Sequence, residues 1–173
     1  NNYTVLTFDD GTKDFYENTF PLLKKYNISA VQYISTKWIG SNGMPSLSHD
    51  YTYKIMNWKD IRELSKSPLI TIGSHSVSHI RLNEINDENF IKEEIEESKL
   101  MIEEKIKKHV KHFSYPKGAY NKKIKEFVNK YGYEIAVSCT QGVNYCDTDR
   151  FSLKRYWVNK HTTIIHFWWM NKG

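Results

Sequence analysis

The sequence contains few cysteines, few prolines and no long apolar segment. Its two cysteines, Cys139 and Cys146, form no Cys-x-x-Cys pair, which argues against a cysteine-built zinc cluster. They fit either one disulfide across a short loop or two free thiols, so the cysteines do not indicate the redox compartment. No apolar run approaches the roughly 18 residues of a membrane span, and we expect no transmembrane segment. The chain has neither an initiator Met nor a visible signal peptide, so we expect a domain whose leader or anchor was removed.

Positive charge is spread along the chain rather than concentrated in one patch. The 173 residues carry a formal net charge of +5, but the lysine pairs stand far apart and are typical of solvated helix faces. We therefore expect no nucleic-acid partner. Tyrosine and tryptophan are frequent, with 12 and 5 residues, and their side chains suit sugar rings as well as protein cores. No feature of the sequence indicates an oligomeric state.

Short apolar runs alternate with amphipathic segments, and we expect one domain over residues 1–173. The patterns predict strands at 4–8, 29–35, 69–73, 110–115, 134–138 and 153–158, and helices at 14–26, 58–66, 87–108, 121–131 and 161–170. Pro21 indicates that the first helix begins late or is kinked. This alternation predicts an α/β fold with a mainly parallel sheet, whose functional residues lie at the C-terminal strand ends. The loop 40–53, with Tyr51 and Tyr53, is expected to shape the rim of a substrate groove.

Two adjacent carboxylates, Asp9 and Asp10, follow the first expected strand and precede Gly11. Asp-Asp-Gly is also typical of an ordinary turn. Carboxylates this close raise each other's pKa unless a cation or hydrogen bonds compensate. The segment Ser74–His79 is a candidate source of that cation, because it follows another strand of the same expected sheet.

The histidines of that segment, His75 and His79, are four residues apart. On a helical turn this spacing places both imidazoles on one face, where they can bind one divalent metal, although surface histidine pairs also occur by chance. Two His and one Asp leave coordination positions open for water, as in catalytic sites. One of Asp9 and Asp10 would then bind the metal, and the other would accept the proton of the water. The indicated reaction is metal-assisted hydrolysis of an amide or ester, with an oxyanion donor in the loop Pro116–Gly118.

Three segments resemble the first three motifs of the polysaccharide deacetylases, carbohydrate esterase family 4. They are Thr7–Gly11 (Thr-Phe-Asp-Asp-Gly), Ser74–His79 (Ser-His-Ser-Val-Ser-His) and Phe113–Gly118 (Phe-Ser-Tyr-Pro-Lys-Gly). The segments Trp58–Ile61 and Leu153–Val158 are also similar to the family. The resemblance covers nearly the whole chain and implies a distorted (β/α) barrel with about seven strands.

The resemblance also implies roles for individual residues. Asp10, His75 and His79 would bind the metal, Asp9 would be the catalytic base, and the backbone N–H of Lys117 would be the oxyanion donor. We expect zinc, although two His and one Asp also accept cobalt or nickel. For substrate binding we predict Tyr115, Pro116 and Trp157.

The chain departs from the family pattern at two places. Many members carry an arginine that contacts the base aspartate where this chain has Ser114. Arg155 from a later segment either fills this gap or forms a surface salt bridge. The family's C-terminal Leu-x-His, whose His protonates the leaving amine, is absent. His161 or His166 would substitute for it, or both are ordinary helix histidines, in which case Asp9 would return its proton to the amine.

The function that these motifs favour is metal-dependent removal of N-acetyl groups from N-acetylglucosamine residues of a surface or extracellular polysaccharide. The third motif resembles the exopolysaccharide poly-N-acetylglucosamine deacetylase branch. The family's substrates place the protein outside the cell or at the cell envelope. One alternative is an O-acetyl esterase acting on xylan-like glycans. Another is a non-catalytic sugar-binding module, against which the intact Asp-Asp and His-His pairs argue.

Overall fold

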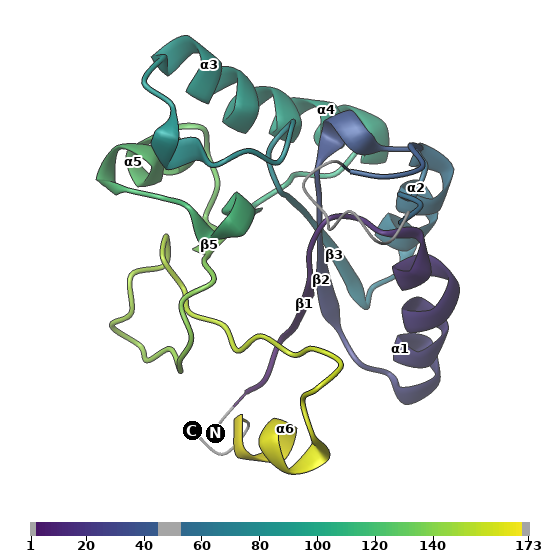
Figure 1. The fold of residues 1–173 in the computed structure, drawn as a ribbon. Coiled ribbons are helices and arrows are strands. Elements are labelled where there is room, and N and C mark those ends of the chain that lie inside the picture. The colour runs from purple at the N-terminus through teal and green to yellow at the C-terminus, as the bar shows by residue number, and fades with distance from the viewer. Residues whose placement is uncertain (1–2, 45–52, 171–173) are drawn as a thin grey trace.

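Five short parallel strands form a curled sheet in which they follow one another in chain order (Figure 1). The computed structural model describes residues 3–44 and 53–170. The strands are β1 (Leu6–Phe8), β2 (Ala30–Ile34), β3 (Ile70–Ser74), β4 (His112–Ser114) and β5 (Ile135–Val137). Each pairs in parallel with the next one, so all five C-terminal strand ends meet at one edge of this half-barrel.

The helices α1 to α5 surround the strands, whereas α6 lies near the first described residues (Figure 1). They are α1 (Phe20–Tyr26), α2 (Trp58–Lys66), α3 (Glu88–Lys92), α4 (Ser98–Ile106), α5 (Lys122–Lys130) and α6 (Ile164–Met170). Two π-helical turns, η1 (Phe15–Thr19) and η4 (Glu93–Glu97), precede α1 and join α3 to α4. Three short 3₁₀ turns are η2 (Thr36–Trp38), η3 (Leu82–Glu84) and η5 (Pro116–Gly118). No helix within the described ranges is both long and apolar enough to cross a membrane.

Side chains of the sheet point alternately to two hydrophobic clusters. The larger cluster lies against the helices and contains, among others, Ile34, Phe113 and Ile95. A smaller cluster on the other face contains Val31, Tyr33 and Val137, with Leu153 packed against it. Val31 and Tyr33 are two residues apart and so share one strand face, as the period of a strand requires. The smaller cluster lines the face of the sheet toward which the C-terminal segment turns.

The predicted helices are confirmed, and capping side chains define where several begin. Asn57 and Asp60 form a capping box at α2, and Asp87 and Asn121 cap α3 and α5. Pro21 lies in the first turn of α1, which begins late, after the η1 turn. The long helix expected at 87–108 is interrupted by the η4 turn, and α4 ends at Ile106.

The expected count of about seven strands is not confirmed, because the described residues contain five. The segment expected as a strand at 153–158 forms only one bridge, between Leu153 and Val137. Beyond Leu153, the side-chain amide of Asn144 accepts from the N–H of Lys154 and donates to its carbonyl. A side chain thus replaces the backbone partner that a continued strand would need. The predicted rim residue Tyr51 lies outside the described residues, whereas Tyr53 is described and exposed.

The capping box gives a test of the fold. Asn57→Ala should lower the free energy of unfolding by about 1 kcal/mol, because the side chain accepts hydrogen bonds from the N–H groups of Lys59 and Asp60. Urea denaturation measures this difference. Lys59→Ala, an exposed change in the same helical turn, is the control and should lower the free energy of unfolding far less. Equal losses in both variants would contradict the role of the cap.

Candidate metal and catalytic site

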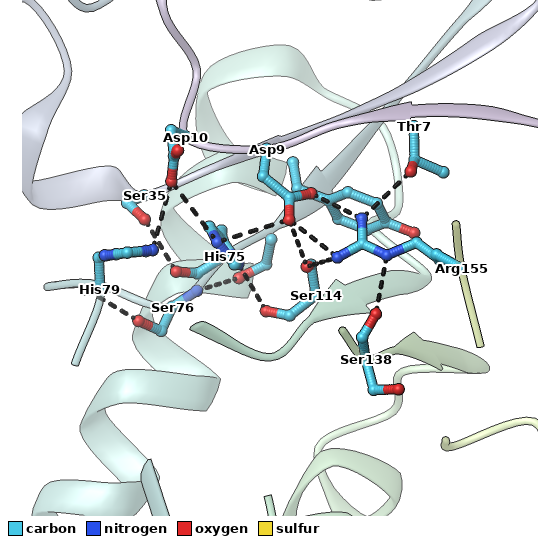
Figure 2. Close-up of polar contacts among 12 residues, drawn as sticks. Thr7, Asp9, Asp10, Ser35, His75, Ser76, His79, Ser114, Ser138 and Arg155 are labelled. Atoms are coloured by element: carbon cyan, nitrogen blue, oxygen red, sulfur yellow. Dashed lines mark hydrogen bonds and ion pairs between the residues drawn. The ribbon is translucent and has the colours of Figure 1, made fainter. Parts of the chain in front are cut away.

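The chain turns sharply where β1 ends, and this turn separates the two adjacent carboxylates. Thr7 and Asp9 are two residues apart, and both side chains point to the same face (Figure 2). Asp10 and Gly11 follow in the left-handed conformation, with φ of 74° and 78°. A Cβ atom on Gly11 would lie 3.1 Å from a methyl carbon of Ile34, so the turn packs closely on β2. Asp10 is thereby directed to a different place from Asp9.

The two histidines come together on a loop rather than on a helical turn. His75 follows β3 directly, and the segment to His79 contains two left-handed residues, Ser76 (φ 64°) and His79 (φ 62°). The N–H of His79 donates to Ser76 Oγ, which closes the loop. The two imidazole centres lie 4.8 Å apart. The expectation of a shared helical face was therefore wrong in geometry, although the two rings do converge.

Asp10, His75 and His79 form a cluster with the composition of a metal site (Figure 2). Asp10 Oδ1 lies 3.6 Å from His75 Nε2 and 3.3 Å from His79 Nε2. One ligand atom from each residue lies within 4.8 Å of the others. Asp10 Oδ1 is buried and has no hydrogen-bond partner among the described residues. A carboxylate oxygen left in this way beside two imidazole nitrogens fits a divalent cation.

A hydrogen bond orients one imidazole, and burial shifts the pKa of the other. His75 Nδ1 lies 2.7 Å from the carbonyl oxygen of Ser114. Because a carbonyl only accepts, Nδ1 carries the hydrogen, and Nε2 is left to face Asp10. Burial, together with the neighbouring His75 and Lys117, lowers the pKa of His79 to about 3. Burial and the nearby charge of Asp9 raise the pKa of Asp10, while His75 and Arg155 act in the opposite direction.

Arg155 reaches across the sheet and binds Asp9 with both ends of its guanidinium group. Its NH1 and NH2 groups lie 2.9 Å from Asp9 Oδ1 and Oδ2, and NH1 also donates to Thr7 Oγ1 (Figure 2). The Ser114 hydroxyl donates to Asp9 Oδ2 at 3.2 Å. Although burial raises the pKa of Asp9, His75, Arg155 and Ser114 together hold it below its usual range. Asp9 is therefore a carboxylate at neutral pH, 3.9 Å from His75 Nε2.

The predicted oxyanion donor and the predicted substrate-binding residues differ in how exposed they are. Lys117 is left-handed (φ 56°) in η5 and lines a groove of about 580 Å³ that also contacts His79. Pro116 is buried. Tyr115 is also fully buried, and its hydroxyl donates to the carbonyl of Phe151. Its role in substrate binding stays a prediction. Trp157 is 73% exposed on its loop.

The two C-terminal histidines are not brought to this cluster. His161 is exposed, and its N–H donates to the Asn159 side chain. His166 belongs to α6, near the first described residues and away from the C-terminal end of β1 (Figure 1). Among the described contacts, neither histidine shares a hydrogen bond or ion pair with Asp9 or Asp10. A role of His161 or His166 as the acid therefore stays a prediction.

Comparison with known proteins agrees with this geometry. A family model described as polysaccharide deacetylase matches residues 1–136. The chain belongs to the polysaccharide deacetylase family.

Individual members show how far the similarity extends. YxkH of Bacillus subtilis, which is named for the same family, is 29% identical over 155 residues, covering 90% of this chain and 51% of YxkH. The poly-beta-1,6-N-acetyl-D-glucosamine N-deacetylase of Staphylococcus epidermidis is 24% identical over 172 residues, covering 94% of this chain and 57% of that enzyme. The chain thus spans about half the length of these relatives. The solved structure of the Streptococcus pyogenes deacetylase PplD superposes on this chain with a TM-score of 0.82 at 22% sequence identity. The superposition covers 96% of this chain and 69% of PplD, so the two share the same fold.

Two contacts of this deacetylase domain were not predicted from its sequence. Thr7 Oγ1 and the carbonyl of Ser138 both accept hydrogen bonds from Arg155. The period of a strand could have indicated Thr7, because it lies two residues before Asp9. Nothing local in the sequence connects Ser138 with Arg155, since the two meet only after the chain has passed β5.

The ion pair of Arg155 with Asp9 gives a second test. Arg155→Gln should lower the free energy of unfolding by roughly 2 kcal/mol, because it leaves a mostly buried carboxylate without its cation. Adding Asp9→Asn should recover part of this loss, since the unpaired charge is then removed. Urea denaturation of the two single variants and the double variant measures the coupling. Strictly additive effects would contradict a direct ion pair.

Proposed function

We propose that this domain is a metal-dependent deacetylase that removes N-acetyl groups from N-acetylglucosamine residues of a surface or extracellular polysaccharide. The observation that carries the proposal is the convergence of Asp10, His75 and His79 beside Asp9, which Arg155 holds as an anion. The activity for which the Staphylococcus epidermidis relative is named supports this choice of sugar. A substrate of this kind would place the protein outside the cell or at its envelope.

In this proposal Asp10, His75 and His79 hold one divalent cation. Two imidazoles and a carboxylate suit zinc, and they also accept cobalt or nickel. When bound, the ion would polarise the acetyl carbonyl and lower the pKa of a water molecule. The low pKa of His79 fits this role, because a neutral imidazole has a free lone pair at physiological pH.

Asp9 is the proposed catalytic base. Its carboxylate takes the proton of the attacking water, and Arg155 keeps it deprotonated and correctly oriented until then. The backbone N–H of Lys117 is the proposed donor to the oxyanion that develops on the acetyl oxygen. Neither His161 nor His166 shares a described hydrogen bond or ion pair with Asp9 or Asp10, and in this proposal Asp9 itself returns the proton to the leaving amine. One carboxyl group thus serves first as base and then as acid.

The groove beside His79 is the proposed binding place for the sugar chain. Its lining residues include Trp38, Ile80 and Phe90 together with the cations Lys37 and Lys117. Aromatic faces pack well against sugar rings, and polar groups at the rim bind their hydroxyls. Trp38 is fixed there because its Nε1–H donates to the carbonyl of Ser78.

Ester hydrolysis is the second candidate, and the absence of a histidine acid among the described site contacts favours it. An alkoxide leaving group needs less help from an acid than an amine does, so the same residues would cleave an O-acetyl ester of a xylan-like glycan. The two activities differ in substrate alone and are separated by the same assay.

The purified protein should release acetate from N-acetylglucosamine oligomers when zinc is supplied, and chelation should stop the release. Asp9→Asn should lower kcat by at least about 100-fold, because an amide cannot accept the proton, while bound zinc is retained. Asp14→Asn, an exposed change nearby, is the control and should leave the rate unchanged. An unaltered rate in Asp9→Asn would contradict its role as base. Release from acetylated xylan alone would favour the esterase.

His75→Ala should abolish stoichiometric zinc binding, because it removes one of the three proposed ligands. Equilibrium dialysis with metal analysis measures the bound zinc independently of activity. His109→Ala is the matched control, since His109 is 89% exposed and remote from the cluster in sequence. One zinc per chain retained in His75→Ala would refute the proposed ligand set.

A further inference from the structure

Glu94 is a buried carboxylate that the proposed mechanism does not use. It lies in the η4 turn and is only 2% exposed. It takes part in none of the ion pairs among the residues that the structure describes. A buried carboxylate without a cation is costly unless hydrogen bonds satisfy its oxygens.

The side-chain hydrogen bonds of Glu94, and one to its backbone carbonyl, go to the loop that carries the histidines. Its Oε2 accepts from the N–H of Ser78 at 2.9 Å, and its Oε1 accepts from the Ser78 hydroxyl at 2.5 Å. Its carbonyl oxygen accepts from the N–H of Val77 at 3.2 Å. Glu94 therefore binds two consecutive residues between His75 and His79.

The same loop is bound from its other side by η2. The N–H groups of Thr36 and Lys37 donate to the carbonyls of Ser76 and Val77, and Trp38 Nε1 donates to the carbonyl of Ser78. The loop thus lies between two supports, with Glu94 on one side and η2 on the other. Such support is needed because the left-handed conformations of Ser76 and His79 are unfavourable for residues other than glycine.

The π-helical turn η4 is the local feature that carries Glu94. Single π turns inside α-helices widen one turn by a residue, and they frequently occur at functional sites. Here the widened turn joins α3 to α4 and carries Glu94 next to the buried Ile95. Ile95 packs into the main core, and its carbonyl accepts from the Tyr133 hydroxyl, so the turn is itself firmly held.

We propose that Glu94 is a positioning residue for the metal site: it holds Ser78 so that His75 and His79 stay convergent on Asp10. This inference rests on the proposed function, because it presumes that these three residues bind a metal. It adds a residue that touches neither metal nor substrate and that acts through the backbone between the two ligands.

Glu94→Leu, which keeps the side-chain size but removes both acceptor oxygens, should weaken zinc binding roughly 10- to 100-fold at unchanged stoichiometry. Glu94→Gln should restore most of the affinity, because an amide can accept from the Ser78 N–H and donate to the Ser78 hydroxyl. Competition with a chromophoric chelator measures the affinity, and the visible spectrum of the cobalt-loaded protein reports the ligand geometry. Ile95→Val, a core change in the same turn, is the control and should alter neither the zinc affinity nor the cobalt spectrum.

The outcomes separate this inference from the proposed function. Wild-type affinity in Glu94→Leu, or an equal loss in Ile95→Val, would overturn the positioning role while leaving the metal site intact. If Glu94→Leu does not fold, Ser78→Ala removes the hydroxyl half of the contact and should still weaken zinc binding by about tenfold. Unchanged binding in Ser78→Ala would then overturn the inference. Failure of the unsubstituted chain to bind zinc would overturn the proposed metal site and this inference with it.

Discussion

The left-handed turn after β1 is the constraint on which the arrangement of the site depends. Two adjacent carboxylates on a regular strand would point to opposite faces of the sheet. At the strand end, Asp10 and Gly11 instead take positive φ values, so Asp9 stays on the inner face while Asp10 turns toward the histidines. A non-glycine residue with positive φ is unfavourable. The turn persists because Gly11 packs against Ile34 and β1 is paired along its length with β2.

The two carboxylates acquire different chemical environments from this separation. Asp9 faces a guanidinium group and a hydroxyl, which hold its pKa low, whereas burial and the charge of Asp9 raise the pKa of Asp10. Pairs of titratable groups whose environments push their pKa values apart are typical of sites with divided roles. Arg155, which contributes to this asymmetry through its bonds to Asp9, comes from a segment remote in sequence and lies over the ring of Tyr33 on the inner face.

The elements of the fold were largely predictable because their signals are local. Asn57, Asp87 and Asn121 cap the helices that follow them, and the five paired strands coincide with five of the six predicted apolar runs. The sixth, at 153–158, failed because Asn144 takes the backbone groups of Lys154, an interaction across a loop that no strand period reveals. The histidine pair was predicted with the wrong local geometry, since a spacing of four residues does not distinguish a helical turn from a closed loop.

The sequence by itself determined the family, the order of strands and helices, and the identity of the candidate metal and base residues, because each rests on short segments with characteristic spacing. Only the tertiary structure decided that Arg155 reaches Asp9, that the buried Tyr115 hydroxyl bonds to Phe151 and that Glu94 binds the histidine loop. These contacts join residues from 16 to 146 positions apart. Their formation depends on how the whole sheet curls and packs, which no local pattern encodes.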